Sequence, residues 1–314
     1  MLVDGRSLNG FLPSTSCVGV DYVRSKVLKE NPEHLRPYLF YGVDLQWSEG
    51  DKNATADCPF CSREGKFAVK IDTGFWRCVV CDAGGEKGGG NVYQFIRDYW
   101  KDCYDNTENY TELRKEKGLL TEDGLRDWGV CLGTLNGSWL VPAYNAEGAI
   151  TVLYKYTRIK DKQGQYKNKL LCCPGLDHNL FGVCNFSEEY QDIYITEGPW
   201  DGIALHECMG FDGSDRFSSA CVLATPGANV FYSRWLKLFS GRTVNILFDS
   251  DRPKEINGKT MEPAGYLGMQ RVADILLTAK EPPTEVNYIN WGDGGFDPNL
   301  PEGTDIRDFL TKKL

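Results

Sequence analysis

Acidic side chains follow two short apolar runs of the sequence, at spacings that could hold a metal ion. Glu197 ends one run, in DIYITEGPWDGIAL, and Asp249 and Asp251 end another, in VNILFDSD. Two residues apart in an extended chain, Asp249 and Asp251 point to the same face. Three carboxylates within about 4 Å of one another would repel by roughly 4 kcal/mol per pair at an effective dielectric constant of about 20. Such a cluster requires a divalent cation, and all-oxygen ligands suit Mg²⁺ or Mn²⁺.

The elements that must position these acids are those of an open α/β sheet. The run before Glu197 has the length and the β-branched or aromatic content of a buried strand. Pro199 suits the first position of a helix, since its missing N–H would be unpaired there anyway. Strand patterns in 220–230 and 286–291 alternate with helix patterns in 230–239 and 269–276, which predicts a parallel, doubly wound sheet. Ligands bind at the carboxyl ends of the strands in such sheets, where these acids are expected.

Residues 190–314 resemble the Toprim domain, which is shared by DnaG-type primases, type IA and type II topoisomerases and some nucleases. The resemblance rests on EGPWDGIAL followed by FDSD. It implies a Rossmann-like, mostly parallel sheet and a magnesium site whose acids are catalytic. The acids at the corresponding positions of this sequence are Glu197, Asp249 and Asp251.

The last acidic motif departs from the pattern of primases. Asp305, in GTDIRDFL, lies where primase Toprim domains carry their carboxyl-terminal acid, which usually follows a lysine, whereas Thr304 precedes it here. The resemblance makes Asp305 a further magnesium ligand. Asp201 and Asp308 are secondary candidates, although Asp201, in the first turn of a helix, could instead stabilise that end of the helix as an anion.

Four cysteines form two pairs with the spacing of a structural zinc site. They are Cys58, Cys61, Cys78 and Cys81. Four thiolates leave Zn²⁺ no open coordination position, so a site of this kind is structural. The chain between the pairs alternates apolar and polar residues like a hairpin, with its turn at 72–74. Because so small a module lacks a sufficient core, the metal would supply folding free energy on the order of 10–16 kcal/mol.

Aromatic and basic residues are interleaved in this zinc ribbon. Its rings, which are more than so small a core can bury, are Phe60, Phe67, Phe75 and Trp76. Aromatic faces with neighbouring cations hold single-stranded bases and phosphates. We therefore expect Trp76 and Lys66 to contact nucleic acid, with core packing as the alternative for any single ring.

The ribbon and the segment after it also carry a resemblance. Residues 92–100 have the apolar spacing of a helix and are expected to pack on the ribbon. The order of cysteine pair, hairpin, Cys81-Asp-Ala-Gly-Gly and helix is similar to the amino-terminal zinc-binding domain of bacterial and phage primases. Many bacterial members have a histidine as the second ligand, whereas Cys61 matches several phage members. Residues 101–125 are polar and charged, and we interpret them as a linker with some helix.

One strongly basic stretch interrupts an otherwise acidic chain. Between residues 155 and 169 the only acid is Asp161, and a local basic stripe of this kind is what phosphate neutralisation requires. Its basic residues are Lys155, Arg158, Lys160, Lys162, Lys167 and Lys169. A solvated hairpin is the alternative. The surrounding pattern, W-L-V-P, an N-x-x-G turn and then LFG, is similar to the basic subdomain that precedes Toprim in primases.

Size and composition limit the remaining possibilities. The chain has 314 residues, 41% of them hydrophobic, so it can bury more than one core. We expect an α/β multidomain protein, with a zinc-ribbon domain over 1–100, a linker over 101–125, a basic α+β subdomain over 126–190 and the Toprim subdomain over 191–314. The net charge of −9 confines nucleic-acid contacts to local surfaces.

No targeting or membrane segment is expected either. The amino-terminal residues do not have the pattern of a signal peptide, and no apolar run is long enough to span a bilayer. We therefore expect a soluble cytoplasmic protein of a bacterium or a phage-infected cell, with its 12 cysteines mostly reduced.

The order of zinc ribbon, basic subdomain and Toprim is that of DnaG-type primases, which implies DNA primase activity. In that reaction a 3′-hydroxyl attacks the α-phosphate of a nucleoside triphosphate, pyrophosphate leaves, and divalent cations neutralise the developing charge. Glu197 would bind metal or move the hydroxyl proton. The implied partners are a single-stranded DNA template, ribonucleoside triphosphates and, because the sequence has no Walker-type motif, a replicative helicase acting in trans.

Three other functions fit parts of the same sequence. A Toprim nuclease would use the same acids to activate water, with less use for a zinc ribbon. A non-catalytic recombination mediator of the RecR type also joins a four-cysteine zinc site to Toprim, but it is typically shorter and opens with helix-hairpin-helix motifs, which are absent here. A topoisomerase would need a longer chain for its strand-passage gate.

Overall fold

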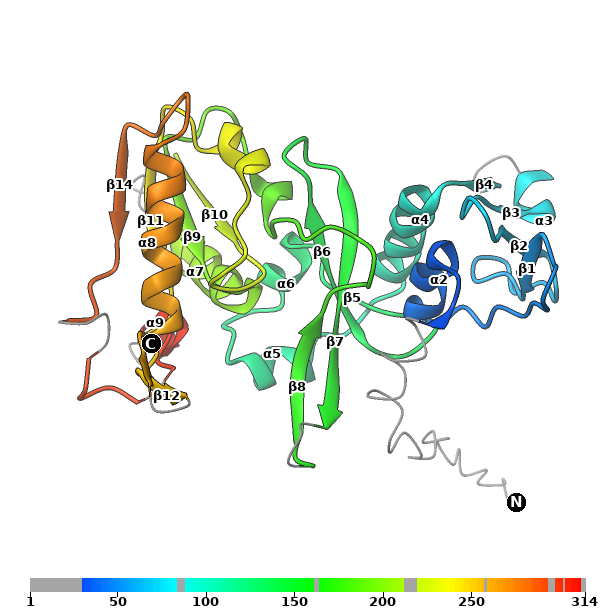
Figure 1. Cartoon of the computed structure of the whole chain (residues 1–314), viewed down its shortest axis with the longest axis horizontal. Coiled ribbons are helices and arrows are strands. Elements are labelled where there is room, and N and C mark those ends of the chain that lie inside the picture. Colours follow the sequence, from blue (N-terminus) through cyan, green and yellow to red (C-terminus); the bar gives the residue numbers. More distant parts are fainter. Residues whose placement is uncertain are drawn as a thin grey trace, which may run out of the picture.

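A computed structural model describes residues 30–83, 88–160, 164–211, 219–256, 259–292, 297–301 and 303–311 of the chain. Three four-stranded sheets follow one another along the longest axis of the molecule, with the amino-terminal sheet at one end and the carboxyl-terminal sheet at the other (Figure 1). Lys162 of the basic stretch lies outside the described residues. Among the described residues, no helix has the length and apolar composition of a membrane span.

The amino-terminal module is a small antiparallel sheet with helices on it. In pairing order its strands are β1 (Asn53–Ala56), β2 (Phe67–Lys70), β3 (Trp76–Cys78) and β4 (Gly89–Gly90). Its helices are the 3-10 turn η1 (Glu33–Leu35), α2 (Arg36–Tyr41), α3 (Val79–Ala83) and α4 (Val92–Asp105). The hairpin predicted between the cysteine pairs is confirmed, because β2 pairs with β3 in antiparallel register, Phe67 opposite Cys78.

Helix α4 packs on this sheet through one apolar face, as its sequence pattern predicts. Asn91 caps the helix, because its side-chain oxygen accepts a hydrogen bond from the Gln94 N–H. Phe95 and Tyr99, four residues apart, are fully buried and point the same way. The Phe95 ring lies 6.1 Å from the ring of Trp76 on β3, which joins helix and sheet in one aromatic core.

Trp76 belongs to this core and not to a surface. Only 2% of the residue is exposed, and its ring stacks on Phe67 with the centroids 5.3 Å apart. The expectation that Trp76 contacts nucleic acid is therefore wrong, because Phe95 of α4 covers a ring that the ribbon alone would leave open. The ribbon instead exposes Phe75, of which 55% is accessible, and Lys66.

A second antiparallel sheet occupies the middle of the molecule. In pairing order its strands are β5 (Cys131–Leu132), β6 (Trp139–Tyr144), β7 (Ile150–Lys160) and β8 (Tyr166–Leu171). The predicted turn between β6 and β7 is present, and the Asn145 side chain accepts the N–H groups of Glu147 and Ala149 there. The 3-10 turn η2 (Val183–Asn185) follows the sheet.

The stretch 101–125, expected to be a linker, is packed against this sheet. It contains the end of α4, the helix α5 (Thr111–Lys117) and the start of α6 (Asp123–Asp127). Leu113 is buried, and the Tyr110 hydroxyl donates a 2.8 Å hydrogen bond to the Val130 carbonyl oxygen. A few apolar contacts therefore hold this mostly polar segment on the sheet. The domain boundaries at 100, 125 and 190 stay a prediction.

The described strands of the carboxyl-terminal sheet are all parallel, which confirms the predicted mixture of antiparallel modules and a parallel α/β sheet. In pairing order they are β10 (Ala220–Ala224), β9 (Asp192–Thr196), β11 (Thr243–Leu247) and β14 (Glu285–Tyr288). The helices of this module are α7 (Pro199–Phe211), α8 (Ala264–Leu277) and α9 (Ile306–Thr311). A small hairpin of β12 (Lys254–Ile256) and β13 (Lys259–Met261) precedes α8.

One predicted helix of this module has a different form. The helix expected in 230–239 is a 3-10 helix, η4 (Ser233–Leu238). Its two buried side chains, Trp235 and Leu238, are three residues apart. That spacing places both on one side of a helix with three residues per turn, so a short 3-10 segment buries them.

The order of the parallel strands reverses beside the acids. Strand β9 lies between β10 and β11, and ligands bind at the carboxyl ends of strands where the strand order reverses in this way. Thr196 at the end of β9 pairs with Leu247 at the end of β11. The residues that follow these two, among them Glu197 and Asp249, therefore leave the sheet side by side.

We expect Gly202→Ala to destabilise the protein. A Cβ atom at Gly202 on α7 would lie 2.4 Å from the Trp128 ring and 3.0 Å from the Thr196 hydroxyl, and overpacking of this kind costs about 1–3 kcal/mol. Gly210→Ala in the same helix is the control, since its Cβ would meet no atom of the described residues within 4 Å, and we expect it to be neutral or stabilising by up to about 1 kcal/mol. Urea unfolding measures both, and equal stabilities for the two variants would contradict the packing of α7 on Trp128.

Candidate functional site

The four cysteines of the ribbon converge as their spacing predicts. The sulfur atoms of Cys58, Cys61, Cys78 and Cys81 all lie within 4.8 Å of one another. The sulfurs of Cys58 and Cys81 are 3.7 Å apart, and those of Cys61 and Cys78 are 3.8 Å apart. Among the described residues, this is the one group of three or more cysteine, histidine or acidic side chains so close together. The set suits a tetrahedral Zn²⁺ ion with no open position.

Backbone geometry shapes the first cysteine pair into a tight loop. The Ser62 N–H donates to the Cys58 carbonyl oxygen at 2.9 Å, and Ser62 has a φ of 55°, which few non-glycine residues adopt. Burial raises the pKa of the Cys58 thiol to about 11. A bound cation would oppose that effect, because zinc binds the thiolate and not the thiol.

Acidic side chains gather at the carboxyl edge of the parallel sheet. We call this group the acidic site, and its members are Glu197, Asp201, Asp249, Asp251 and Asp305. Glu197 follows β9, and Asp249 and Asp251 follow β11. Asp305 reaches the same edge because Ser250 and Thr304 form a short antiparallel bridge, with the Ser250 N–H donating to the Thr304 carbonyl oxygen at 2.8 Å.

The carboxylates of the acidic site repel one another in a largely dry environment. Burial, followed by the charges of Glu197, Asp201, Asp305 and Asp251, raises the pKa of Asp249 to about 9. Burial and the neighbouring Asp251 raise the pKa of Glu197 above its usual value. The structure therefore brings Glu197, Asp249 and Asp251 together within electrostatic reach, as the sequence predicts.

Asp201 is more central to the acidic site than its position in the sequence indicates. It is 8% exposed, and burial and the charge of Asp305 raise its pKa to about 7, with Arg307 opposing the shift. One oxygen of Asp201 and one of Glu197, Oδ1 and Oε2 respectively, are buried and accept no hydrogen bond from the described residues. Unsatisfied buried acceptors are costly, and a cation placed between them would satisfy both.

These carboxylates fit a magnesium ion that is only partly held by protein. Within the described part of the chain, no three of these acidic residues bring ligand oxygens together in a compact group like that of the cysteines, and Oδ2 of Asp251 already accepts the Gly265 N–H at 3.2 Å. Mg²⁺ is usually held by one or two carboxylates, with water and substrate phosphates completing its six ligands. Oε2 of Glu197 and Oδ1 of Asp201, which accept no hydrogen bond from the described residues, are the oxygens best placed for such an arrangement, although Oδ1 of Asp201 also lies 3.6 Å from the Arg307 guanidinium.

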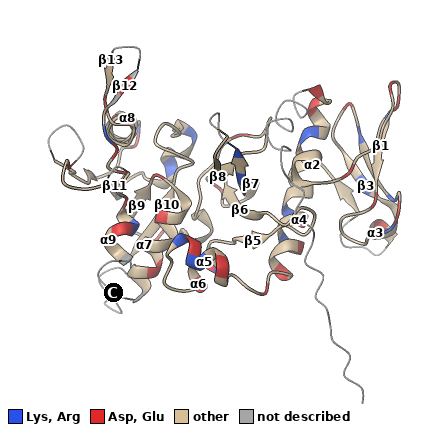
Figure 2. Cartoon of the chain, turned by 90° about the horizontal axis from the view of Figure 1, so that it is seen from below, with Lys and Arg blue, Asp and Glu red and all other residues tan. Residues whose placement is uncertain are grey.

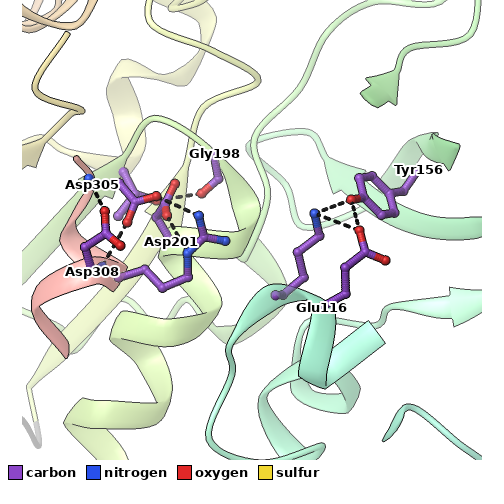
Figure 3. A network of polar contacts seen from close by, with 9 residues as sticks. Glu116, Tyr156, Gly198, Asp201, Asp305 and Asp308 are labelled. Carbon is purple, nitrogen blue, oxygen red and sulfur yellow. Dashed lines mark hydrogen bonds and ion pairs between the residues drawn. The ribbon is translucent and has the colours of Figure 1, made fainter. Parts of the chain in front are cut away.

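A guanidinium group partly neutralises the acidic site. Arg307 of α9 pairs with Oδ2 of Asp305 at 2.6 Å and with Oδ1 of Asp201 at 3.6 Å (Figure 3). The sequence did not predict a role for Arg307. The available signal was Thr304, which stands where a lysine is expected and so indicates that another residue must supply the positive charge. Thr304 is 2% exposed, so a lysine side chain there would be buried at the bridge, and the cation comes instead from the first turn of the next helix.

Asp308 has a structural part in this arrangement. Its N–H donates to Oδ1 of Asp305 at 3.0 Å, and its own Oδ2 accepts the Asp305 N–H at 3.3 Å. This reciprocal pair satisfies free donors at the start of α9. Asp308 therefore caps the helix, and Asp305 both caps it and pairs with Arg307.

The basic stretch forms the long hairpin of β7 and β8, which the ribbon and the parallel sheet flank (Figure 2). Because side chains alternate along a strand, its cations divide between two faces. Arg158 and Lys160 lie on one face, 4.9 Å and 5.3 Å from the centre of the Tyr166 ring. Lys167 and Lys169 are exposed on the opposite face.

Lys155 does not belong to this basic surface. The residue is 4% exposed, and its Nζ lies 3.4 Å from the Phe40 carbonyl oxygen and 4.8 Å from the Phe40 ring centre. The expectation that Lys155 contacts nucleic acid is therefore wrong, because α2, from a distant part of the chain, covers this end of the strand.

Comparison with known proteins yields similarity in structure and none in sequence. No family model matches the chain, and no curated protein matches its sequence. The zinc-binding and RNA polymerase domains of the Aquifex aeolicus primase match at 16% identity and a TM-score of 0.44, over 92% of this chain and 82% of that one. The primase fragment of the bacteriophage T7 primase-helicase protein matches at 16% identity and a TM-score of 0.39, over 82% and 93% of the two chains.

A DNA primase domain from Pseudomonas aeruginosa also matches, at 18% identity and a TM-score of 0.47, over 70% of this chain and 74% of that one. Similarities of this size do not assign a role to any residue of the chain. The roles of the acidic site and of the basic hairpin therefore depend on their own geometry.

Loss of one ribbon cysteine should release the zinc. We expect Cys58→Ser to lower the bound zinc from about one ion per chain to near zero and to unfold the amino-terminal module, since such sites supply roughly 10–16 kcal/mol of folding free energy. Metal analysis after dialysis and limited proteolysis measure the two effects. Cys208→Ser on α7, a half-buried cysteine outside the cluster, is the control and should keep its zinc. Full zinc content in Cys58→Ser would contradict the assignment.

The acidic site should make the protein less stable as the pH rises. The pKa of Asp249 is about 9 in the folded protein against a reference value of 3.8, so the folded state holds a proton that the unfolded state releases. Stability linked to this proton is complete below pH 3.8 and is lost as the pH rises towards 9, at up to about 1.4 kcal/mol per pH unit.

Asp249→Asn should remove the pH-dependent part of the unfolding free energy that is linked to the Asp249 proton. In urea unfolding between pH 5.5 and 8.5, the variant should gain stability relative to the unmodified protein as the pH rises, and added Mg²⁺ should reduce the difference by stabilising the native carboxylate. A difference in unfolding free energy that does not change with pH would contradict the raised pKa of Asp249.

Proposed function

We propose that this protein is a DNA primase, which makes short RNA primers on single-stranded DNA by metal-dependent nucleotidyl transfer. The observation that carries the proposal is the acidic site, where five carboxylates from distant segments lie within electrostatic reach of one another at the carboxyl edge of a parallel sheet. Carboxylates gathered against their own repulsion favour divalent cations and phosphate chemistry.

The surfaces around the acidic site suit a nucleic-acid template. Trp200, in the first turn of α7, packs edge-on against Tyr156 of β7, with ring centroids 5.1 Å apart, so the basic hairpin adjoins the acidic site. Arg158 and Lys160 would neutralise template phosphates, and the partly exposed Tyr166 ring would stack on a base. Phe75 and Lys66 would give the zinc ribbon its own contact with the template.

The reaction would join a 3′-hydroxyl to the α-phosphate of a ribonucleoside triphosphate, with pyrophosphate leaving. Bound Mg²⁺ would neutralise charge on the triphosphate and the attacking oxygen. Glu197 and Asp201 would hold it through the oxygens that accept no hydrogen bond from the described residues, and Asp249 and Asp251 would complete the site. Arg307 would keep Asp201 and Asp305 in place. Duplex unwinding would come from a replicative helicase acting in trans.

The modules would divide these tasks. The ribbon within residues 1–100 would read the template, residues 126–190 would hold it, and residues 191–314 would carry the catalytic acids. The stretch 101–125 would connect them while packing on the central sheet, as Leu113 and Tyr110 do.

A primer-synthesis assay tests the proposal. Single-stranded DNA, labelled ribonucleotides and Mg²⁺ should yield new oligonucleotides, and Asp249→Asn or Asp251→Asn should lower the yield by roughly 10²-fold or more, because each removes charge from the metal site. Asp274→Asn, on the exposed side of α8, is the matched control and should be unchanged. Product made at full rate by both site variants would contradict the metal assignment.

The same assay separates the alternatives. Nicked template in place of new oligonucleotides would indicate a nuclease that uses the same acids. Template binding without any product would indicate a non-catalytic mediator.

A further inference from the structure

The carboxylate of Glu116 accepts hydrogen bonds from both strands of the basic hairpin. Its Oε1 accepts a hydrogen bond from the Tyr156 hydroxyl on β7 and a 2.7 Å hydrogen bond from the Asn168 side-chain amide on β8. Tyr156 pairs with Leu170, two residues beyond Asn168, so the two donors lie diagonally on one face of the hairpin. One oxygen at the end of α5 therefore fixes the face that also carries Arg158.

The next residue of α5 continues this contact towards the acidic site. The Lys117 ammonium donates to the Tyr156 hydroxyl and lies 3.8 Å from Oε1 of Glu116 (Figure 3). It also lies 3.9 Å from the ring centre of Tyr156 and 4.8 Å from that of Trp200. Trp200 directly precedes Asp201, so three segments meet at this cation: α5, the hairpin and the start of α7.

The burial of Lys117 requires these partners. Its side chain is 12% exposed, and burying a charge is costly unless hydrogen bonds, an opposite charge or aromatic faces compensate. Burial lowers the pKa of Lys117 to about 8, with Glu116 and Asp201 opposing the shift and Arg307 adding to it. The ammonium is therefore within the electric field of the acidic site, and Glu116 is the anion that keeps it there.

We propose that Glu116 is a positioning residue, which holds the basic hairpin and Lys117 against Trp200 so that a strand bound along the hairpin is aligned with the acidic site. This inference rests on the proposed function. The contacts of Glu116 are with Tyr156, Asn168 and Lys117, so it acts on the hairpin and the acidic site through these three residues.

A positioning residue affects turnover more than binding. In Glu116→Ala the hairpin keeps Arg158, Lys160, Lys167 and Lys169, so its dissociation constant for single-stranded DNA should change by less than about twofold. The kcat of primer synthesis should fall by about tenfold or more, because small displacements of bound reactants are costly in rate. Glu116→Gln, which keeps an acceptor oxygen for Tyr156 and Asn168, should recover most of the kcat.

Two further variants sharpen the test. Glu112→Ala is the matched control, since Glu112 lies one turn earlier on α5 with its side chain 89% exposed, and it should have no effect. Asn168→Ala should cost little in the Glu116→Ala background, because its partner is already gone, and such non-additivity identifies a shared interaction.

A measurement independent of catalysis separates failure of this inference from failure of the proposed function. Hydrogen exchange should accelerate in β7 and β8 in Glu116→Ala and not in Glu112→Ala. If the unmodified protein makes no primers, the proposed function fails, while exchange still shows whether Glu116 holds the hairpin. Unchanged exchange, or equal losses of kcat in Glu116→Ala and Glu116→Gln, would overturn the positioning role.

Discussion

The repulsion between partly buried carboxylates is the constraint on which the rest of the structure depends. At about 4 Å and an effective dielectric constant near 20, each pair of charges costs roughly 4 kcal/mol, so the chain must hold these side chains together by other means. The parallel sheet does so through fully buried side chains on its two central strands, where Ile193 and Ile195 of β9 lie beside Val244 and Ile246 of β11. The repulsion is relieved by protons at Asp249 and Asp201, and by one guanidinium group.

The position of that guanidinium follows from the same geometry. The chain returns to the sheet edge through the bridge between Ser250 and Thr304, and both of these residues are 2% exposed. A cationic side chain at Thr304 would be buried in the bridge, whereas Arg307, one turn into α9, can reach both Asp201 and Asp305. Arg307, three residues after Thr304, therefore supplies the positive charge that partly balances these two carboxylates.

The features that the sequence predicts are those set by local patterns. The strand, turn and helix around Glu197, the cysteine pairs and the alternation of the parallel module all follow from spacing within short windows, and the structure confirms the elements. The convergence of Glu197 with Asp249 follows as well, because parallel strands end at one edge.

The features that the sequence does not predict depend on contacts between distant segments. Trp76 is buried because Phe95 of α4 covers it, and Lys155 because α2 does. Glu116 and Lys117 lie in a polar stretch that reads as a linker, and their partners Tyr156 and Trp200 are far away in the sequence. The spacing of apolar and polar residues within 101–125 does not predict these contacts. Each contact depends on a single side chain and on how the whole module packs.

The two groups of potential metal ligands differ in a way that indicates different tasks. Four sulfurs within 4.8 Å of one another can complete a tetrahedron around zinc, so an ion there would have no place for a substrate. Among the described residues, the acidic site instead leaves one oxygen of Glu197 and one of Asp201 without a hydrogen bond, and no three of its residues form a compact ligand group. A cation bound by such a set must take its remaining ligands from water or from phosphate oxygens. The incompleteness of the acidic site is therefore what makes it suited to chemistry on a nucleotide, while the completeness of the cysteine site suits it to holding a fold.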